Sequence, residues 1–321
     1  QTVTGVQTCA LPIWINKINT GESGLGIRLI TPVAALLDQE ILLEGKGSIL
    51  SRPMNVIENA IRDLGGYCET NEGYMPIKVK GPLEGGEIKL DGSLSSQFLS
   101  GLLFALPLAK KDSVIHVSNL QSKPYIDLTL DVLEKHGIKV ENHTYQKFII
   151  PGNQKYQSAE YTIESDWSNG AFLLVAAAIG GKLKLYGLNP DSLQGDKKIL
   201  EALTSAGVNF EFTQDHYEIR KTGDLQAFEF DATETPDLFP PLAVLAAHCS
   251  GTSYIRGAKR LVHKESNRAE SLISELSRMG IDIRLKDEDT LEIKGGQVNG
   301  GDFDSHSDHR IAMAGALLAF D

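Results

Sequence analysis

The pattern of apolar and polar positions repeats along the chain. Five segments share one design, in which small, polar or charged residues come directly before an apolar stretch of about three to four helical turns. These segments begin at Gly21, Gly92, Ser165, Thr235 and Ser307. Small polar residues favour helix starts, and a helix without a polar face is typical of a domain interior. Each segment therefore predicts a buried helix that begins at its polar residues.

The five segments recur at a constant spacing. Asp166, Asp237 and Asp308 follow one another at intervals of 71 residues, and Gly21 and Gly92 are separated by the same distance. A fixed period of this kind indicates an internal structural repeat.

Between the apolar segments the pattern changes in the same order each time. A β-like run such as SVIHVSNL comes first, then an amphipathic helical pattern that ends near a glycine, as in NRAESLISELSRMGI, then two short strands joined by a turn. The repeat predicts a βαβαββ unit. Four copies are complete or nearly so, and we expect a fifth to end inside its first helix at Asp321.

The length of 321 residues favours two hydrophobic cores. We expect a first domain over residues 14–163 with two repeats, and a second over residues 164–321 with two repeats and an incomplete third. Residues 1–13 fit no element of the repeat and lack the basic and apolar regions of a signal peptide. We interpret them as a non-native leader.

Composition narrows the class of protein. A hydrophobic content of 41% is ordinary for a soluble protein, and no apolar stretch approaches the roughly 18 residues of a membrane-spanning helix. A net charge of -11 argues against nucleic acid as a partner. Cys9, Cys68 and Cys249 have no CxxC spacing, which argues against a disulfide framework or a cysteine zinc site and favours a reducing cytoplasm.

The helix starts are where we expect chemistry. Parallel helices would gather their free N–H groups and dipoles at one face, which suits phosphates and carboxylates. Ser95, Ser96 and Gln97 lie at such a start, where hydroxyl groups either cap the helix or help to hold a phosphate.

Charged and polar side chains gather at equivalent junctions of the repeat. They are Arg52, Ser122, Lys123, Tyr125, His263, Lys264, Glu265, Arg268, Asp308, His309 and Arg310. Each one alone would be an ordinary solvated group, but together, on an acidic protein, they indicate a small polyanionic substrate. Asp237 and Glu265 are open to two interpretations, as a helix cap or charge partner on one side and as a proton acceptor on the other.

The segments GSLSSQFLSGLL, SKPYIDLTL, TPD, HKESNR and SDHRIAM resemble, in order and separation, the 5-enolpyruvylshikimate-3-phosphate synthases among the enolpyruvyl transferases. The resemblance runs from about residue 15 to the end. It implies an α/β fold, an inside-out α/β barrel of two domains built from βαβαββ units, which closes on its substrates. It also implies transfer of the enolpyruvyl group of phosphoenolpyruvate to the 5-hydroxyl of shikimate 3-phosphate, with release of phosphate, in chorismate and aromatic amino-acid biosynthesis. A monomer in the cytoplasm that needs no metal or redox cofactor is implied as well.

The resemblance assigns roles by position. The residues implied to bind shikimate 3-phosphate are Ser95, Ser96, Ser122, Tyr125, Asp237 and Lys264. Those implied to bind phosphoenolpyruvate are Gly24, Arg52, Gln97, Arg268 and Arg310. Asp237 is implied to accept the proton of the 5-hydroxyl, and Glu265 to relay a proton at the methylene carbon. Arg28 is also in place, whereas Arg260 stands where the family commonly has an asparagine that touches the phosphate.

The family's first unit and a lysine beyond the SDHR helix have no counterpart in the sequence. We therefore expect a chain truncated at both ends, marginally stable and with little or no turnover. One alternative is the sister transferase that acts on UDP-N-acetylglucosamine, whose loop cysteine neither Cys68 nor Cys249 matches. The other is a noncatalytic repeat module.

Overall fold

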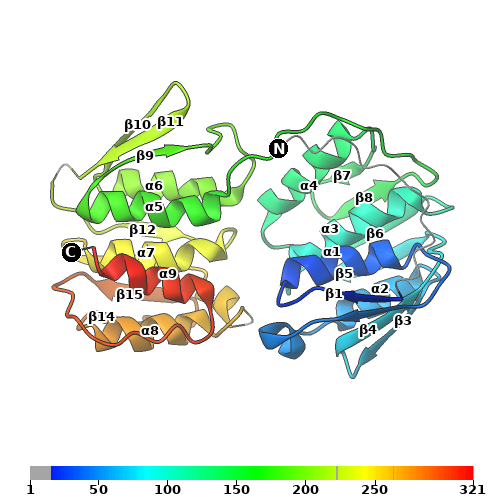
Figure 1. Ribbon diagram of the computed structural model, residues 1–321, viewed down its shortest axis with the longest axis horizontal. Helices are drawn as coiled ribbons and strands as arrows, with labels where there is room; N and C mark the ends of the chain where they lie inside the picture. Colours follow the sequence, from blue (N-terminus) through cyan, green and yellow to red (C-terminus); the bar gives the residue numbers. More distant parts are fainter. Residues whose placement is uncertain (1–15, 222, 263, 321) are drawn as a thin grey trace. The chain divides into compact units, whose positions relative to one another are not determined.

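The computed structural model describes residues 16–221, 223–262 and 264–320 (Figure 1). The chain divides between Tyr161 and Thr162 into two compact units. Each unit has its own cluster of buried apolar side chains. The expected leader over residues 1–13 and the candidate His263 lie outside the described residues.

The first unit contains two copies of the predicted repeat. The first copy is β1 (Lys17–Asn19), α1 (Gly24–Ala34), β2 (Ile41–Glu44), α2 (Asn55–Asp63), β3 (Tyr67–Asn71) and β4 (Tyr74–Lys80). The second copy is β5 (Glu87–Asp91), α3 (Ser96–Ala105), β6 (Ser113–Ser118), α4 (Lys123–Lys135), β7 (Glu141–His143) and β8 (Lys147–Ile150). Short 3₁₀ turns η1 (Gly47–Ser51) and η2 (Leu106–Leu108) complete the unit.

The second unit continues the series. The third copy is α5 (Trp167–Gly180), β9 (Lys182–Tyr186), α6 (Ile199–Ser205), β10 (Asn209–Thr213) and β11 (His216–Arg220). The fourth is β12 (Glu229–Asp231), α7 (Phe239–Ala247), β13 (Thr252–Arg256), α8 (Arg268–Arg278), β14 (Asp282–Leu285) and β15 (Thr290–Lys294), followed by α9 (His309–Leu318). Three 3₁₀ turns lie between these elements, η3 (Gly195–Lys198), η4 (Pro236–Leu238) and η5 (Ala258–Leu261).

The sheets repeat one topology. The strand orders β1-β2-β4-β3, β5-β6-β8-β7 and β12-β13-β15-β14 are equivalent, with a parallel first pair and antiparallel pairs after it. The third copy differs, because its sheet has the order β10-β11-β9 and the described residues between β8 and α5 form no strand. Alternation along β4 buries Met75, Ile77 and Val79 and exposes the residues between them, as expected for a sheet with one buried face.

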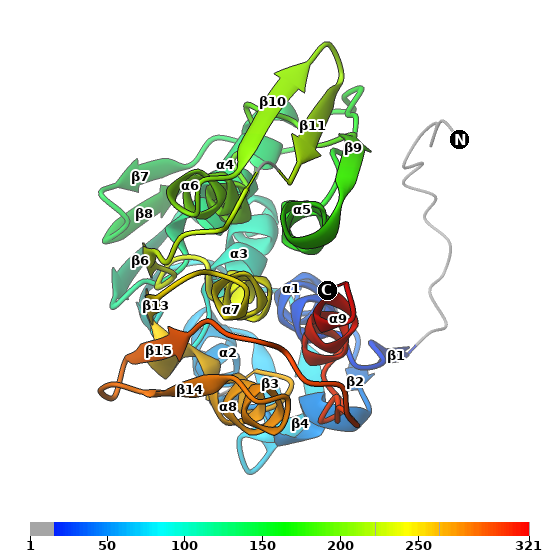
Figure 2. The same cartoon turned by 90° about the vertical axis from the view of Figure 1, so that its left-hand side faces the viewer.

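The helices without a polar face lie inside each unit, as their sequences predict. Every residue of α7 is buried, because no side of this helix carries a polar stripe. In the second unit α5, α7 and α9 pack against one another, and Figure 2 views them along their axes. In the first unit α1 packs on α3 so closely that a Cβ at Gly101 would lie 2.3 Å from the carbonyl oxygen of Arg28.

The amphipathic helices end at glycine, as predicted. The residues that follow α2, α4, α6 and α8 in the left-handed conformation are Gly65, Gly137, Gly207 and Gly280, with φ of 87°, 76°, 81° and 87°. Glycine adopts this conformation without a steric penalty and turns the chain toward the next strand. No helix in the described ranges is long and apolar enough to cross a membrane.

Candidate active site

In the first unit, the starts of α3 and α4 lie side by side. Ser100 Oγ and Thr129 Oγ1 are 2.8 Å apart, and each residue lies in the second turn of its helix. Ser95 caps α3, because its Oγ accepts a hydrogen bond from the Gln97 N–H at 3.2 Å. The simpler role considered for Ser95 is thus present in this structure.

The residues Ser122 and Tyr125 belong to the start of α4. Ser122 is buried and has a left-handed backbone (φ 56°), and its side chain does not cap the helix. Its carbonyl oxygen accepts the Tyr125 N–H at 3.2 Å. A buried serine in a sparsely populated conformation, with a hydroxyl not used for capping, is common at binding sites.

Two arginines converge on the start of α1. A Cβ at Gly24, the first residue of α1, would lie 2.5 Å from Arg52 Nη1 and 3.5 Å from Arg28 Nη1. Arg28 Nη1 donates to the Gln97 Oε1 at 2.9 Å, and its guanidinium lies 5.0 Å from the centre of the Phe98 ring. Gly24, Arg28, Arg52 and Gln97, here called the Gly24 group, therefore bring two buried positive charges to one helix N-terminus.

In the second unit, Asp237 is the meeting point of three cations. Asp237 Oδ1 lies 2.7 Å from Arg268 Nη1 and 3.1 Å from Lys264 Nζ, and Asp237 Oδ2 lies 3.4 Å from Arg310 Nη2. Burial alone would raise the pKa of Asp237, but the charges of Lys264, Arg310 and Arg268 outweigh it and hold the pKa well below its ordinary value of 3.8. Asp237 is a carboxylate at neutral pH.

Arg268 is the most buried cation of this group, with 1% of its side chain exposed. Each of its three guanidinium nitrogens donates a hydrogen bond to a carboxylate. Nη1 donates to Asp237, Nη2 donates to Glu265 at 2.5 Å, and Nε donates to Asp308 Oδ2 at 2.8 Å. Asp308 also caps α9, accepting the Arg310 N–H at 2.9 Å. The starts of α7, α8 and α9 are thus joined by one guanidinium.

The second unit therefore holds a charge-balanced group and not a purely cationic pocket. Its members, here called the Arg268 group, are Asp237, Lys264, Glu265, Arg268, Asp308 and Arg310. Burial is the main cause of a lowered pKa at Lys264, with Asp237 opposing it. Arg310 has one donor that could bind a ligand, because its Nη1 is buried and has no hydrogen-bond partner among the described residues.

Arg260 is close enough to Glu234 and Asp237 for their charges to act on it. Its Nη1 donates to the Thr233 carbonyl oxygen at 3.2 Å, and burial lowers its pKa. In the ranges that the structure describes, no three or more histidine, cysteine or acidic side chains are arranged to hold a metal ion.

Comparisons with known proteins identify the family of the chain. The family model described as EPSP synthase (3-phosphoshikimate 1-carboxyvinyltransferase) matches residues 2–321. The chain belongs to the EPSP synthase family. The predicted family and fold class are therefore confirmed, and neither the UDP-N-acetylglucosamine enzyme nor a noncatalytic repeat module is favoured.

Individual relatives of this EPSP synthase family member are similar over most of its length. A 3-phosphoshikimate 1-carboxyvinyltransferase of Clostridium novyi is 41% identical over 306 residues, which cover 95% of this chain and 70% of the relative. One from Methanococcoides burtonii is 40% identical, covering 93% and 71%. The solved EPSP synthase of Acinetobacter baumannii superposes with a TM-score of 0.76 at 26% identity, over 95% of this chain and 72% of the other.

One buried charged residue of α8 was not predicted from the sequence. Glu275 is an acidic residue in line with the buried Leu272 and Leu276 of this helix. An acid on the apolar stripe of an amphipathic helix is unusual and is the signal that would have found it.

The depressed pKa of Asp237 predicts a pH-dependent stability. Folding favours the ionised form, so the stabilisation is complete above the unfolded pKa near 3.8 and is lost as the pH falls below it toward the folded value. We expect the difference in unfolding free energy between the wild type and Asp237→Asn, measured with urea, to be constant from about pH 8 to 5 and to shrink below about pH 4.

The matched control is Asp302→Asn, which changes an exposed carboxylate in the same unit. A difference for Asp237→Asn that stays constant down to about pH 2 would contradict the ion-pair assignment, because the carboxylate would then contribute equally in both charge states.

Proposed function

We propose that this chain carries substrate-binding and catalytic groups for transfer of the enolpyruvyl group of phosphoenolpyruvate to the 5-hydroxyl of shikimate 3-phosphate. The Arg268 group is the observation that supports this most strongly. It combines a proton-accepting carboxylate, a buried lysine and two arginines at the starts of three helices, in a member of the EPSP synthase family. The reaction releases phosphate and belongs to chorismate and aromatic amino-acid biosynthesis.

As the family resemblance implies, we assign shikimate 3-phosphate to six residues. The residues are Ser95, Ser96, Ser122, Tyr125, Lys264 and Asp237. Adjacent starts of α3 and α4 supply N–H groups and hydroxyls suited to a phosphate. Lys264 offers a compact positive charge.

As the family resemblance implies, we assign phosphoenolpyruvate to Gly24, Arg52, Gln97, Arg268 and Arg310. Arginine forks suit the carboxylate and phosphate of this substrate, since both bind two parallel N–H donors. Arg310 Nη1 supplies a donor that is already desolvated. Arg268 gives its nitrogens to carboxylates, so we assign it mainly to holding the group together.

The chemistry follows from these positions. O5 of shikimate 3-phosphate forms a bond to C2 of phosphoenolpyruvate, its proton passes to Asp237, and C3 gains a proton relayed by Glu265. The tetrahedral intermediate then loses phosphate from C2 and a proton from C3, which restores the double bond. Fixed cations stabilise the charge that develops on the leaving phosphate.

Substrate binding would also adjust the base. Asp237 has a low pKa because Lys264, Arg310 and Arg268 face it. When phosphate and carboxylate groups of the substrates engage those cations, their pull on Asp237 falls and its pKa rises. Asp237 thus becomes a better proton acceptor when the substrates are present.

The remaining features of the proposal concern the protein as a whole. We infer a cytoplasmic monomer that uses no metal or redox cofactor and binds neither nucleic acid nor a membrane. The net charge of -11 supports the inference about nucleic acid.

Titration calorimetry tests the proposal. We expect the wild-type chain to bind shikimate 3-phosphate, and phosphoenolpyruvate in its presence. Lys264→Ala should lower the affinity for shikimate 3-phosphate, and Arg310→Ala the affinity for phosphoenolpyruvate, by about 10- to 100-fold. The reason is that each variant loses a charge-assisted contact of about 1.5–3 kcal/mol. Arg284→Ala, which breaks an exposed ion pair with Glu292, is the control. Absence of binding in the wild type, or equal effects in all three variants, would refute the assignment.

A second experiment concerns Gly24. Alanine at this position would place a methyl group 2.5 Å from Arg52 Nη1, which must move. The free energy of unfolding should change little, because the atom in contact ends a flexible side chain. Phosphoenolpyruvate affinity should fall by about 10-fold or more if the guanidinium contacts it.

Gly181→Ala is the matched control, since a Cβ there meets nothing within 4 Å. Unchanged phosphoenolpyruvate affinity in Gly24→Ala would remove Arg52 from the proposed site.

A further inference from the structure

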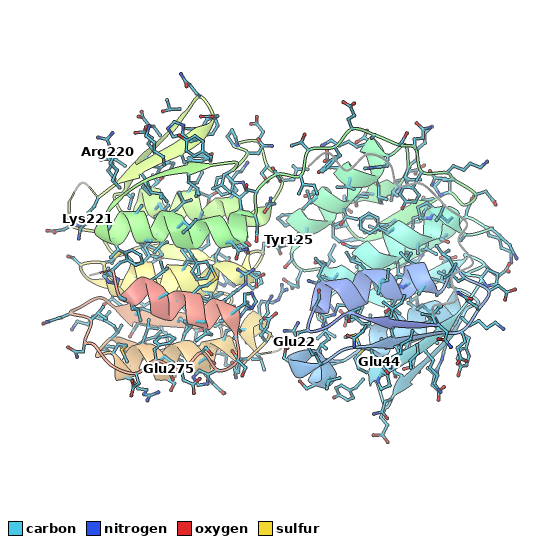
Figure 3. All side chains as sticks on the ribbon, in the orientation of Figure 1. Glu22, Glu44, Tyr125, Arg220, Lys221 and Glu275 are labelled. Atoms are coloured by element: carbon cyan, nitrogen blue, oxygen red, sulfur yellow. The ribbon has the colours of Figure 1, made fainter. Side chains whose placement is uncertain are left out.

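Helix α8 carries two buried charged side chains on one face. Arg268 and Glu275 are seven residues apart, or about two turns, and each has 1% of its side chain exposed. Both bind the segment of residues 302–308 that leads into α9. Figure 3 labels Glu275 where α8 meets this segment.

Glu275 is fully engaged by this contact. Its Oε2 accepts the Asp304 N–H at 2.9 Å, and its Oε1 lies 2.9 Å from His306 Nε2. Arg278 and Ser274 donate to the same carboxylate. Burial alone would raise the pKa of Glu275, but the hydrogen bonds from Asp304 and His306 outweigh it and lower the pKa. Glu275 is therefore a buried anion, and two of its four partners, Asp304 and His306, lie on one short segment outside its own helix.

The backbone between the two anchors is strained. His306 and Ser307 both have left-handed conformations, with φ of 50° and 56°. Residues other than glycine rarely adopt this backbone conformation, and they keep it only where contacts with their surroundings stabilise it. Glu275 binds Asp304 before this pair and His306 within it, and Arg268 binds Asp308 after it.

The segment determines where Arg310 lies. Asp308 comes directly after the strained pair, and it accepts the Arg310 N–H at 2.9 Å as the cap of α9. Arg310 then reaches Asp237 at 3.4 Å. A shift of residues 304–307 would move the cap and, with it, the guanidinium.

We infer that Glu275 is a positioning residue, which clamps residues 304–307 to α8 and so sets Arg310 for the anionic substrate that it contacts. This inference rests on the proposed function for the identity of that substrate, phosphoenolpyruvate. The clamp itself is a property of the second unit without any ligand.

Hydrogen exchange of the ligand-free chain tests the clamp. Glu275→Gln keeps the shape and one acceptor but cannot accept from both Asp304 and His306. We expect amides in a peptide covering residues 302–312 to exchange at least about 5-fold faster, with α7 and β13 unchanged, because only a local opening is made easier. Glu270→Gln, an exposed acid on the same helix, is the control and should change neither.

Calorimetry tests the consequence for binding. In Glu275→Gln the affinity for phosphoenolpyruvate, measured with shikimate 3-phosphate present, should fall by about 3- to 10-fold, while shikimate 3-phosphate affinity stays within about 2-fold. His306→Ala removes the same contact from the other side. Its effect should be in the same direction but smaller, because the Asp304 N–H still donates to Glu275. The double variant should be no weaker than Glu275→Gln, because His306 is bound to α8 through Glu275.

The outcomes separate this inference from the proposed function. Unchanged exchange, or faster exchange throughout the second unit with equal loss of both ligands, would overturn the positioning role. Unchanged phosphoenolpyruvate affinity in Glu275→Gln would overturn it as well. If the wild type binds neither ligand, the proposed function fails, and the exchange experiment still decides whether Glu275 clamps the segment.

Discussion

The second unit depends on a single buried guanidinium, that of Arg268. A charge removed from water is tolerated only when it is paired and hydrogen-bonded, and Arg268 meets that requirement with Asp237, Glu265 and Asp308. Because those carboxylates lie at the starts of different elements, satisfying one side chain fixes the starts of α7, α8 and α9 together. The remaining cations, Lys264 and Arg310, are then placed by Asp237.

In the Gly24 group of the first unit, two arginines lie close together at one helix start. Arg28 donates to the neutral amide oxygen of Gln97, and Arg28 and Arg52 share the space above Gly24. The close approach of α1 and α3 at Gly101 brings these side chains within reach. Anionic ligands at the Arg268 group would compete with Asp237 for Lys264, Arg310 and Arg268, which couples ligand binding there to the basicity of Asp237.

Three features of the fold were predictable: the repeat, the buried helices and the glycines after the amphipathic helices. Each follows from local chemistry, namely apolar periodicity, helix capping and left-handed backbone. The positions of the helix starts were predictable for the same reason. The pairing of Arg268 with three carboxylates was not, since hydrogen bonds between Arg268 and Asp308, 40 residues apart, depend on how α8 and α9 pack. The sequence therefore suggested a cationic pocket where the structure has a balanced group.

The most direct measurement is the coupling energy between Arg268 and Asp308, from urea unfolding of Arg268→Met, Asp308→Asn and the double variant. Arg268→Met alone should destabilise the second unit by about 3–5 kcal/mol, because it leaves Asp308 charged, buried and without its main partner. Adding Asp308→Asn should recover part of that loss, with a coupling of about 1–3 kcal/mol. Additive effects within about 0.5 kcal/mol would contradict the account, because Arg268 would then not be what holds these helix starts together.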